Sequence, residues 1–482
     1  MGFWCVGKRV RARIVVAGVL VWAGLVAGVA VAQGLPPALQ SVFQKTGLNQ
    51  GDVSIVVQEL NGPRLISINP ELPRNPASVM KTVTTWAGLS ALGPEYRWRT
   101  AFYLPGPQAV DAQGTVRGPI YLKAGGDPLL QLQDLWMLLR ELRLRGIKNL
   151  TEVVVDRSMF GDVAIDPDAF DDSGDRPYNA SPDALMVSLG ALRLSFQPDM
   201  RHKKWVPVID PPVPGVRVEG QIGWSDAPCP GSPSVATHIT PTQGGAVITV
   251  GGKAAGSCGE FSIYRLVLSQ PDNFEAVFRV IWKELGGTLG RGFKAGVTPR
   301  NAVLLAWHDS DTLADTIRQI NKYSNNVMAR TLLLTLGAEQ SGPGATPQTG
   351  AQAALSVLQR QGVDTRGWVI DNGSGLSRNG RLTAAGLAGL LNTAWNSPMM
   401  SEFMSSLAIA GVDGTVRRRL RDDEARGMAH LKTGTLRDTR AMAGYVQGVS
   451  GKRYLMVSFA EGERSWAVRS FDDALVRWLS EQ

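Results

Sequence analysis

The stretch Asn75-Pro76-Ala77-Ser78-Val79-Met80-Lys81 opens the segment on which both the fold and the chemistry of this chain depend. Asn75 is a good helix N-cap and Pro76 suits the first helical position, so the stretch predicts a helix start. Apolar residues then recur at helical spacing up to a stop at Gly93: Val79, Met80, Val83, Trp86 and Leu89. The predicted helix places Ser78 and Lys81 on one face, within one turn of each other.

Ser78 and Lys81 form a candidate nucleophile and base. A serine is inert as a nucleophile unless a neighbour removes its proton, and a partly neutral lysine can do so. Burial and a second cation lower a lysine pKa, and we expect Lys432 to be that second cation. The dipole of the helix N-terminus also favours negative charge developing near Ser78. The alternative is a capping hydroxyl beside a solvated lysine, since this spacing is common on exposed helices.

Two further motifs follow in the chain. Ser324-Asn325-Asn326 interrupts the helical pattern of residues 311–336, and Lys432-Thr433-Gly434-Thr435 leads into strand-like runs at 441–446 and 454–459. Each motif has copies elsewhere, at Ser67-Ile68-Asn69, Ser377-Arg378-Asn379 and Lys45-Thr46-Gly47. The copies at 45 and 67 precede Ser78, and the copy at 377 lies in a Gly-rich loop. The missing side chain of Gly434 would let a substrate backbone approach the strand.

The ordered set S-x-x-K, S-x-N, K-T-G is the signature of the penicillin-recognising serine enzymes. Further stretches resemble the low-molecular-mass class C penicillin-binding proteins, the D-alanyl-D-alanine carboxypeptidase/endopeptidase family of the penicillin-binding protein 4 type. They are Gly125-Gly126-Asp127-Pro128, Tyr178-Asn179-Ala180-Ser181-Pro182, Asn321-Lys322-Tyr323, Asp371-Asn372-Gly373-Ser374-Gly375-Leu376-Ser377 and Gly411-Val412-Asp413-Gly414-Thr415. The resemblance extends over nearly the whole chain after residue 32. The separation of 246 residues between Ser78 and Ser324 agrees with the large insertion that this family carries there.

The resemblance implies a role for each residue. Ser78 would form the acyl-enzyme, Lys81 would take its proton, and Ser324 would relay a proton to the leaving amine. The implied substrate-binding residues are Asn326, Lys432, Thr433, Gly434 and Thr435, and the implied oxyanion site lies between the backbone N–H groups of Ser78 and Thr435. No cofactor and no metal are implied.

The implied activity is that of a serine DD-carboxypeptidase/DD-endopeptidase acting on peptidoglycan stem peptides. β-Lactam antibiotics would then acylate Ser78 as inhibitors. The alternatives are a serine β-lactamase and a catalytically weak cell-wall-binding scaffold.

The expected fold class is α+β. It is a penicillin-binding-protein/β-lactamase-like transpeptidase domain, an antiparallel sheet flanked by helices, formed by residues 33–96 and 266–482. A hairpin over residues 53–69 and the C-terminal strands would share this sheet. Short β-like runs between Gly, Pro and Asp clusters predict that residues 97–265 are an insertion of one or two small, mostly β domains.

The N-terminus predicts export. Lys8, Arg9, Arg11 and Arg13 precede the apolar run 14–32, which ends in Ala30-Val31-Ala32, so residues 1–32 read as a cleaved signal peptide. An uncleaved membrane anchor is the alternative. Removing four cations from a net charge of +8 leaves +4, a nearly balanced protein in which nucleic acid is not an expected partner. We therefore expect a periplasmic or cell-envelope protein with at most a loose membrane association.

Export also changes the meaning of the cysteines. Cys5 lies in the predicted signal, which leaves Cys229 and Cys258 as an even pair in an oxidising compartment. We expect a disulfide between them, closing a loop of about 30 residues and contributing roughly 3 kcal/mol. Two buried free thiols are the alternative.

Overall fold

The computed structural model describes residues 34–231 and 233–482. The predicted signal peptide lies outside the described residues and stays a prediction. Within the described part, no helix combines the length and the apolar character needed to cross a membrane.

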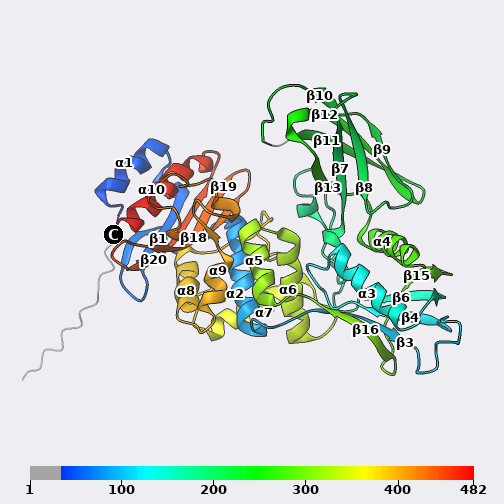
Figure 1. The fold of residues 1–482 in the computed structure, drawn as a ribbon. Helices are drawn as coiled ribbons and strands as arrows, with labels where there is room; N and C mark the ends of the chain where they lie inside the picture. The colour runs from blue at the N-terminus through cyan, green and yellow to red at the C-terminus, as the bar shows by residue number, and fades with distance from the viewer. Residues whose placement is uncertain (1–33, 232) are drawn as a thin grey trace, which may run out of the picture. The chain divides into compact units, whose positions relative to one another are not determined.

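One antiparallel sheet joins the two ends of the described chain (Figure 1). Its six strands, in order across the sheet, are β17 (Ala408–Ile409), β18 (Ala429–Thr435), β19 (Thr439–Gln447), β20 (Arg453–Glu461), β1 (Val53–Glu59) and β2 (Arg64–Ile68). Strand β1 pairs with β20, with Val53 opposite Ala460. The predicted hairpin and the predicted sheet of N- and C-terminal strands are therefore both present.

Both faces of this sheet are covered by helices. Helices α1 (Pro37–Thr46) and α10 (Val468–Ser480) pack on one face, where Met442 and Val446 of β19 are buried. Helices α2 (Met80–Leu92) and α8 (Ala384–Trp395) pack on the other, where Ala441, Ala443 and Tyr445 are buried. Successive residues of a strand point to opposite faces, so β19 contributes side chains to the hydrophobic cores on both faces of the sheet. Its sequence is therefore apolar without alternation.

Helix α2 is the centre of the helical layer. All ten residues from Met80 to Leu89 are buried, because α2 packs against further helices as well as the sheet. These helices are α5 (Leu313–Tyr323), α6 (Asn326–Ser341), α7 (Pro347–Arg360) and α9 (Met400–Ser406). A helix that is buried on every side is held in place by the side chains packed around it, so the hydrophobic core fixes the position of α2.

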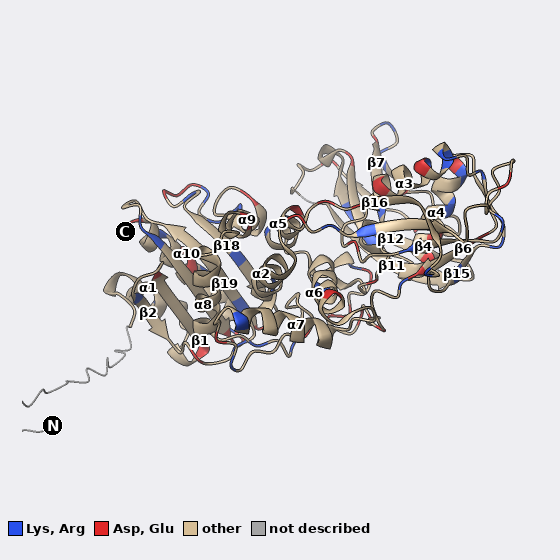
Figure 2. Cartoon of the chain, turned by 90° about the horizontal axis from the view of Figure 1, so that it is seen from below, with Lys and Arg blue, Asp and Glu red and all other residues tan. Residues whose placement is uncertain are grey.

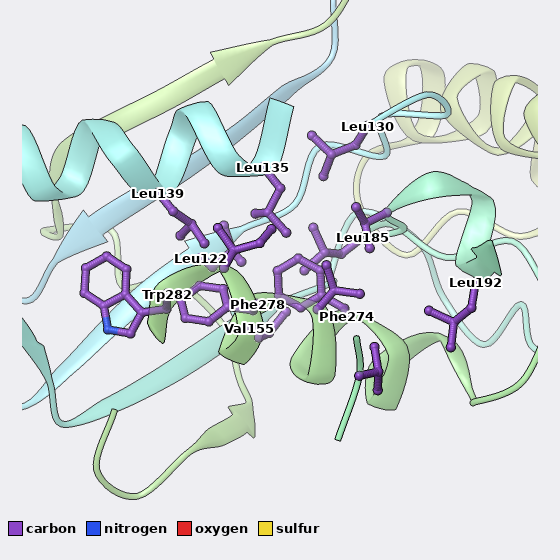
Figure 3. Close-up of a cluster of buried hydrophobic side chains, with 14 of the residues drawn as sticks. Leu122, Leu130, Leu135, Leu139, Val155, Leu185, Leu192, Phe274, Phe278 and Trp282 are labelled. Carbon is purple, nitrogen blue, oxygen red and sulfur yellow. The ribbon is translucent and has the colours of Figure 1, made fainter. Parts of the chain in front are cut away.

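A second sheet of five strands, mixed in direction, lies in the inserted portion. Its strands, in order, are β15 (Phe293–Ala295), β6 (Glu152–Asp156), β4 (Pro119–Lys123), β3 (Arg99–Leu104) and β16 (Val303–Asp309). Helices α3 (Leu132–Leu144) and α4 (Gln270–Glu284) pack on it through Leu139, Phe278 and Trp282, as Figure 3 shows. The short strands β5 (Asn149–Leu150) and β14 (Thr288–Leu289) pair in parallel beside it.

The remaining inserted residues are β-rich, as predicted. One sheet holds β7 (Ala191–Asp199), β8 (Lys204–Asp210) and β13 (Phe261–Leu266), and another holds β9 (Val216–Gly220), β10 (Gly223–Ser225), β11 (Ser234–Thr242) and β12 (Gly245–Ala255). The predicted disulfide between Cys229 and Cys258 is confirmed.

The strand pairings of the inserted portion extend beyond residue 265, the predicted boundary. The chain returns from it after β16, which pairs with β3 as far as Asp309 opposite Arg99, rather than at residue 265. The physical reason is that β14, β15 and β16 complete sheets whose other strands end at or before residue 156. Between residues 97 and 265 the described elements are strands apart from helix α3 and short 3-10 turns, so this stretch is mostly β. The α+β class itself is confirmed.

Candidate active site

Ser78 lies in a turn that precedes α2. The turn η2 (Ala77–Val79) is a 3-10 helix, and regular α-helix begins only at Met80, later than the sequence predicts. Asn75 is not the N-cap that the sequence predicts, since Pro76 holds that position before η2, but its Oδ1 accepts from the Ala77 N–H at 2.9 Å and stabilises the turn. Ala77 has φ of 44°, a left-handed conformation that costs energy in a residue with a side chain. The backbone is thus held in a strained turn immediately before Ser78.

Lys81 is fully buried and has three acceptors. Its Nζ donates to Ser78 Oγ at 3.1 Å, to Asn326 Oδ1 at 2.6 Å and to the Ser374 carbonyl at 2.6 Å. Burial lowers the pKa of Lys81 well below its usual range, and the positive charges of Lys432 and Arg330 lower it further. The amine beside the Ser78 hydroxyl is therefore readily available in its neutral form.

The Ser-x-Asn motif lies at the break between α5 and α6. Ser324 ends α5 in the left-handed conformation with φ of 58°, and Asn325 caps α6 by accepting from the Met328 N–H at 3.1 Å. Asn326 is then the first residue of α6, with its amide oxygen on Lys81 and its amide nitrogen donating to the Tyr178 carbonyl at 3.3 Å. The helix break therefore turns both motif side chains toward the site.

Lys432 is a second buried amine. It lies on β18, and its Nζ donates to Ser324 Oγ at 2.9 Å and to the Thr433 carbonyl at 2.8 Å. Burial lowers the pKa of Lys432 to about 7. The hydrogen bonds join the three motifs into two groups, Lys81 with Ser78 and Asn326, and Lys432 with Ser324.

Gly434 lies directly against the backbone of the turn that carries Ser78, a contact that the sequence does not predict. A Cβ placed on it would lie 2.6 Å from the Pro76 carbonyl oxygen, 2.9 Å from Ala77 Cβ and 3.0 Å from the Ser78 nitrogen. The space left by its missing side chain is filled by the Ser78 turn. Gly434 thus brings strand β18 against the backbone of Ser78, and the predicted approach of a substrate to this glycine is replaced by an internal contact.

The two threonines flanking Gly434 lie at the edge of the sheet. Thr433 Oγ1 is 2.8 Å from Thr415 Oγ1, and Thr435 is exposed. Strand β17 pairs with β18 only at His430 and Leu431, so Thr433 and Thr435 lie beyond the end of that neighbouring strand. Because the Leu436 N–H bonds to β19, at the Thr439 carbonyl, the alternation of an antiparallel ladder turns the Thr435 N–H the other way, toward the free edge.

The structure places two of the motif copies away from the site, and the third, at Ser377, beside it without a hydrogen bond to either lysine. Lys45-Thr46-Gly47 ends α1, and Ser67-Ile68-Asn69 lies at the end of β2. Ser377 accepts from Asn75 through its carbonyl, but its hydroxyl donates to Asp371 at 2.6 Å. None of the hydrogen bonds of Lys81 or Lys432 goes to these copies.

Other residues at the site were not singled out from the sequence as functional. The Ser374 carbonyl, an acceptor for Lys81, lies in a loop shaped by Asn372, whose Oδ1 accepts from the Ser374 N–H at 3.0 Å. Lys322 and Asp413 form a 2.5 Å ion pair, and Asp413 also accepts from the Ile409 N–H. Both loops belong to stretches that carried the family resemblance, and that was the only sequence signal for them.

Charge alone does not single out this site. In Figure 2 the Lys and Arg segments and the Asp and Glu segments are scattered over the cartoon. What distinguishes the site is that two lysines, Lys81 and Lys432, are among the largest fully buried side chains. Buried amines are costly unless they are paired, and these two are held by hydroxyl, amide and carbonyl oxygens.

Comparison with known proteins identifies the family of the chain. The model of the D-Ala-D-Ala carboxypeptidase 3 (S13) family matches residues 35–482. The D-alanyl-D-alanine carboxypeptidase of Actinomadura sp. (strain R39) is 28% identical over 422 residues, 84% of this chain and 77% of the relative. D-alanyl-D-alanine carboxypeptidase DacB of Haemophilus influenzae is 24% identical over 447 residues, 89% of this chain and 87% of the relative. Penicillin binding protein 4 from H. influenzae has a similar fold, with a TM-score of 0.74 at 23% identity over 92% of this chain and 99% of that one, and a TM-score of 0.72 in its complex with a β-lactam.

Proposed function

This chain belongs to the D-Ala-D-Ala carboxypeptidase 3 (S13) family and is a serine-type D-alanyl-D-alanine carboxypeptidase, a hydrolase; from that premise we propose how its own residues carry out the reaction. Ser78 is the nucleophile, Lys81 its base, and Ser324 the group that protonates the leaving amine. The observation that carries this assignment is the position of the buried Lys81 Nζ, 3.1 Å from Ser78 Oγ and 2.6 Å from Asn326 Oδ1.

Acylation begins with proton transfer from Ser78 to Lys81. The neutral Lys81 amine accepts the hydroxyl proton while Ser78 Oγ forms a bond to the carbonyl carbon of the penultimate D-alanine. The lowered pKa of Lys81 supports this role, because an ammonium could not accept the proton. Asn326 and the Ser374 carbonyl keep the Nζ in place through the transfer.

The tetrahedral oxyanion then lies between the N–H groups of Ser78 and Thr435. The contact of Gly434 with the Ser78 turn supports this placement, since it holds the two backbone segments together. A preorganised donor of this kind contributes roughly 3 kcal/mol to the stability of the transition state. The strained Ala77 turn fixes the direction of the Ser78 N–H.

Collapse of the intermediate breaks the peptide bond and releases the terminal D-alanine. The leaving amine takes a proton from Ser324 Oγ, which lies 2.9 Å from Lys432 Nζ, and the proton that Lys81 accepted from Ser78 passes on to Ser324, so that both groups are restored. Protonated Lys432, with Thr433 and Thr435, binds the C-terminal carboxylate of the substrate. Asn326 holds the amide of the acyl side, and a water then attacks the acyl-enzyme and frees Ser78.

The substrate and setting follow from the same assignment. The substrate is a peptidoglycan stem peptide ending in D-Ala-D-Ala, and cross-links between stems are cleaved by the same acylation. Such a substrate places the enzyme in the cell envelope, in agreement with the predicted periplasmic export. β-Lactams acylate Ser78, as the β-lactam complex of the H. influenzae relative supports.

Labelling with a fluorescent penicillin tests the assignment. Wild-type protein is expected to give a covalent band, and Ser78→Ala none. Lys432→Ala should weaken labelling, whereas Lys45→Ala in the Lys-Thr-Gly copy at the end of α1 should leave it unchanged. A band that survives Ser78→Ala refutes the nucleophile. D-alanine release from a pentapeptide with slow nitrocefin turnover is expected, and nitrocefin turnover well above peptide turnover would identify a β-lactamase instead.

A further inference from the structure

A pocket of about 160 Å³ continues from the Lys-Thr-Gly strand toward α10. Its walls include both motif threonines, Thr433 and Thr435, together with three arginines from three different segments: Arg419, Arg440 and Arg469. Arg419 follows the turn η6 (Gly414–Val416), Arg440 lies on β19, and Arg469 lies in the first turn of α10. The pocket therefore adjoins the place where the proposed mechanism binds the carboxylate of the leaving residue.

The pocket is electropositive. Arg419 pairs with Asp473 at 2.8 Å, and Arg440 donates only to the carbonyls of Leu436 and Thr439. In the part of the chain that the structure describes, neither Arg440 nor Arg469 has an ion-pair partner. The one acid in its lining is Asp472.

Asp472 neutralises the arginines only in part near neutral pH. It is almost completely buried, burial raises its pKa to about 7, and its Oδ1 has no hydrogen-bond partner among the described residues. This oxygen has almost no accessible surface, so a ligand in the pocket meets the arginines rather than Asp472. Two arginines without carboxylate partners among the described residues, Arg440 and Arg469, thus line the same small space.

We propose that this pocket is a subsite for the leaving strand of a peptidoglycan cross-link and that it recognises a carboxylate on that strand. The inference rests on the proposed function and adds a substrate preference to it. In the carboxypeptidase reaction the leaving group is a single D-alanine, whose side chain is a methyl. In cross-link cleavage the leaving residue continues into a second stem peptide, which carries free carboxylates of its own.

The position of the pocket fits this difference. Because Thr433 and Thr435 share the pocket with Arg440 and Arg469, a leaving residue held by its first carboxylate at the threonines could extend its side chain toward these arginines. Arginine is suited to this task, because its planar guanidinium binds a carboxylate through two parallel hydrogen bonds. A volume of about 160 Å³ accommodates a short chain with a carboxylate.

The test compares two substrates on each protein. kcat/KM is measured for a cross-linked muropeptide dimer and for a monomeric pentapeptide, and the ratio of the two is followed in Arg469→Gln and Arg440→Gln. Arg418→Gln is the matched control, since Arg418 is an exposed arginine of the same loop that does not line the pocket. A dimer whose leaving-strand carboxylates are amidated is the matched substrate. Thermal melting checks that each variant is folded.

We expect the ratio of dimer to pentapeptide kcat/KM to fall about tenfold in Arg469→Gln and Arg440→Gln, mainly through KM, because a charge-assisted hydrogen bond is lost. Arg418→Gln should keep the wild-type ratio, and the wild type should lose the same advantage on the amidated dimer. An unchanged ratio in both pocket variants, or an equal fall in Arg418→Gln, overturns the subsite. Failure of the proposed function is distinct, since wild-type protein would then neither bind penicillin at Ser78 nor cleave the pentapeptide.

Discussion

Replacing Gly434 by alanine tests how the Lys-Thr-Gly strand and the Ser78 turn depend on each other. The added Cβ would lie 2.6 Å from the Pro76 carbonyl oxygen, whereas ordinary van der Waals contact begins at 3.4 Å. The difference requires the strand and the turn to separate by about 0.8 Å, because the nearest atoms belong to backbone and to the short Ala77 side chain. That movement would part the two N–H groups proposed to hold the oxyanion.

Gly434→Ala should lower both the rate of acylation and the stability of the fold. A misplacement near 1 Å lowers a rate about 100-fold, which corresponds to roughly 2.7 kcal/mol and is close to the loss of one oxyanion donor. Overpacking should lower the free energy of unfolding by about 1–3 kcal/mol. The second-order rate of acylation is measured with a fluorescent penicillin, and unfolding is followed by thermal denaturation of the same preparation.

Gly389→Ala is the matched control. Gly389 is an exposed position in the middle of α8, and a Cβ placed on it would have no heavy atom within 4 Å. The same substitution there should leave acylation unchanged and stabilise the protein by up to about 1 kcal/mol, because alanine is the better helix former. If folded Gly434→Ala is acylated within threefold of the wild-type rate, the close approach of β18 does not position the oxyanion site, and the reasoning is wrong.

Three further predictions concern pH and stability. The kcat/KM for a pentapeptide should rise with pH as Lys81 becomes neutral and fall above about pH 7 as Lys432 loses its proton. Lys432→Arg, if active, should shift only the fall in kcat/KM to higher pH, because arginine stays charged. A fall at the same pH as in wild type contradicts the role of Lys432. Cys229→Ser should lower the free energy of unfolding by roughly 3 kcal/mol with acylation unchanged, and a reducing agent should reproduce this loss in wild type but add nothing to the variant. Asp472 has a folded pKa of about 7 against 3.8 for the free group, so its contribution to stability is full below pH 3.8 and is lost as pH rises through 7. In denaturant titrations, the free energy of unfolding of Asp472→Asn relative to wild type should therefore increase by a few kcal/mol between pH 4 and 8. If the difference in unfolding free energy between the two proteins does not change with pH, Asp472 does not become a buried charge.

Much of the site could be predicted because its motifs carry local signals. The Asn75 cap and the apolar spacing after it predict α2, and the polar interruption at Ser324 predicts the break between α5 and α6. The order of the three motifs, rather than any one of them, separates the site from its copies. The class of the fold follows from strand-like runs at both ends of the chain.

The remainder depends on contacts between distant segments, which leave no local pattern. The return of the inserted portion at Asp309 is set by pairing of β16 with β3, about 200 residues earlier. The third acceptor of Lys81 is the backbone carbonyl of Ser374, and a backbone atom has no signature in the residue type. The close approach at Gly434 likewise involves the turn at Ala77, which a cap-and-helix pattern describes as ordinary helix.

The pairing of β1 with β20 also determines when during synthesis the protein can fold. Val53 is matched with Ala460, so the first strand of the sheet is synthesised about 400 residues before its partner. Ser78 and Lys81 therefore exist long before Lys432 and the strand that carries it. Strands so far apart in sequence pair slowly, since the entropic cost of closing a long loop comes before the favourable free energy of the contact. A nascent or truncated chain lacking its last strands should consequently be unable to attack cell-wall peptides, and hydrolytic power would appear only when the whole polypeptide is finished.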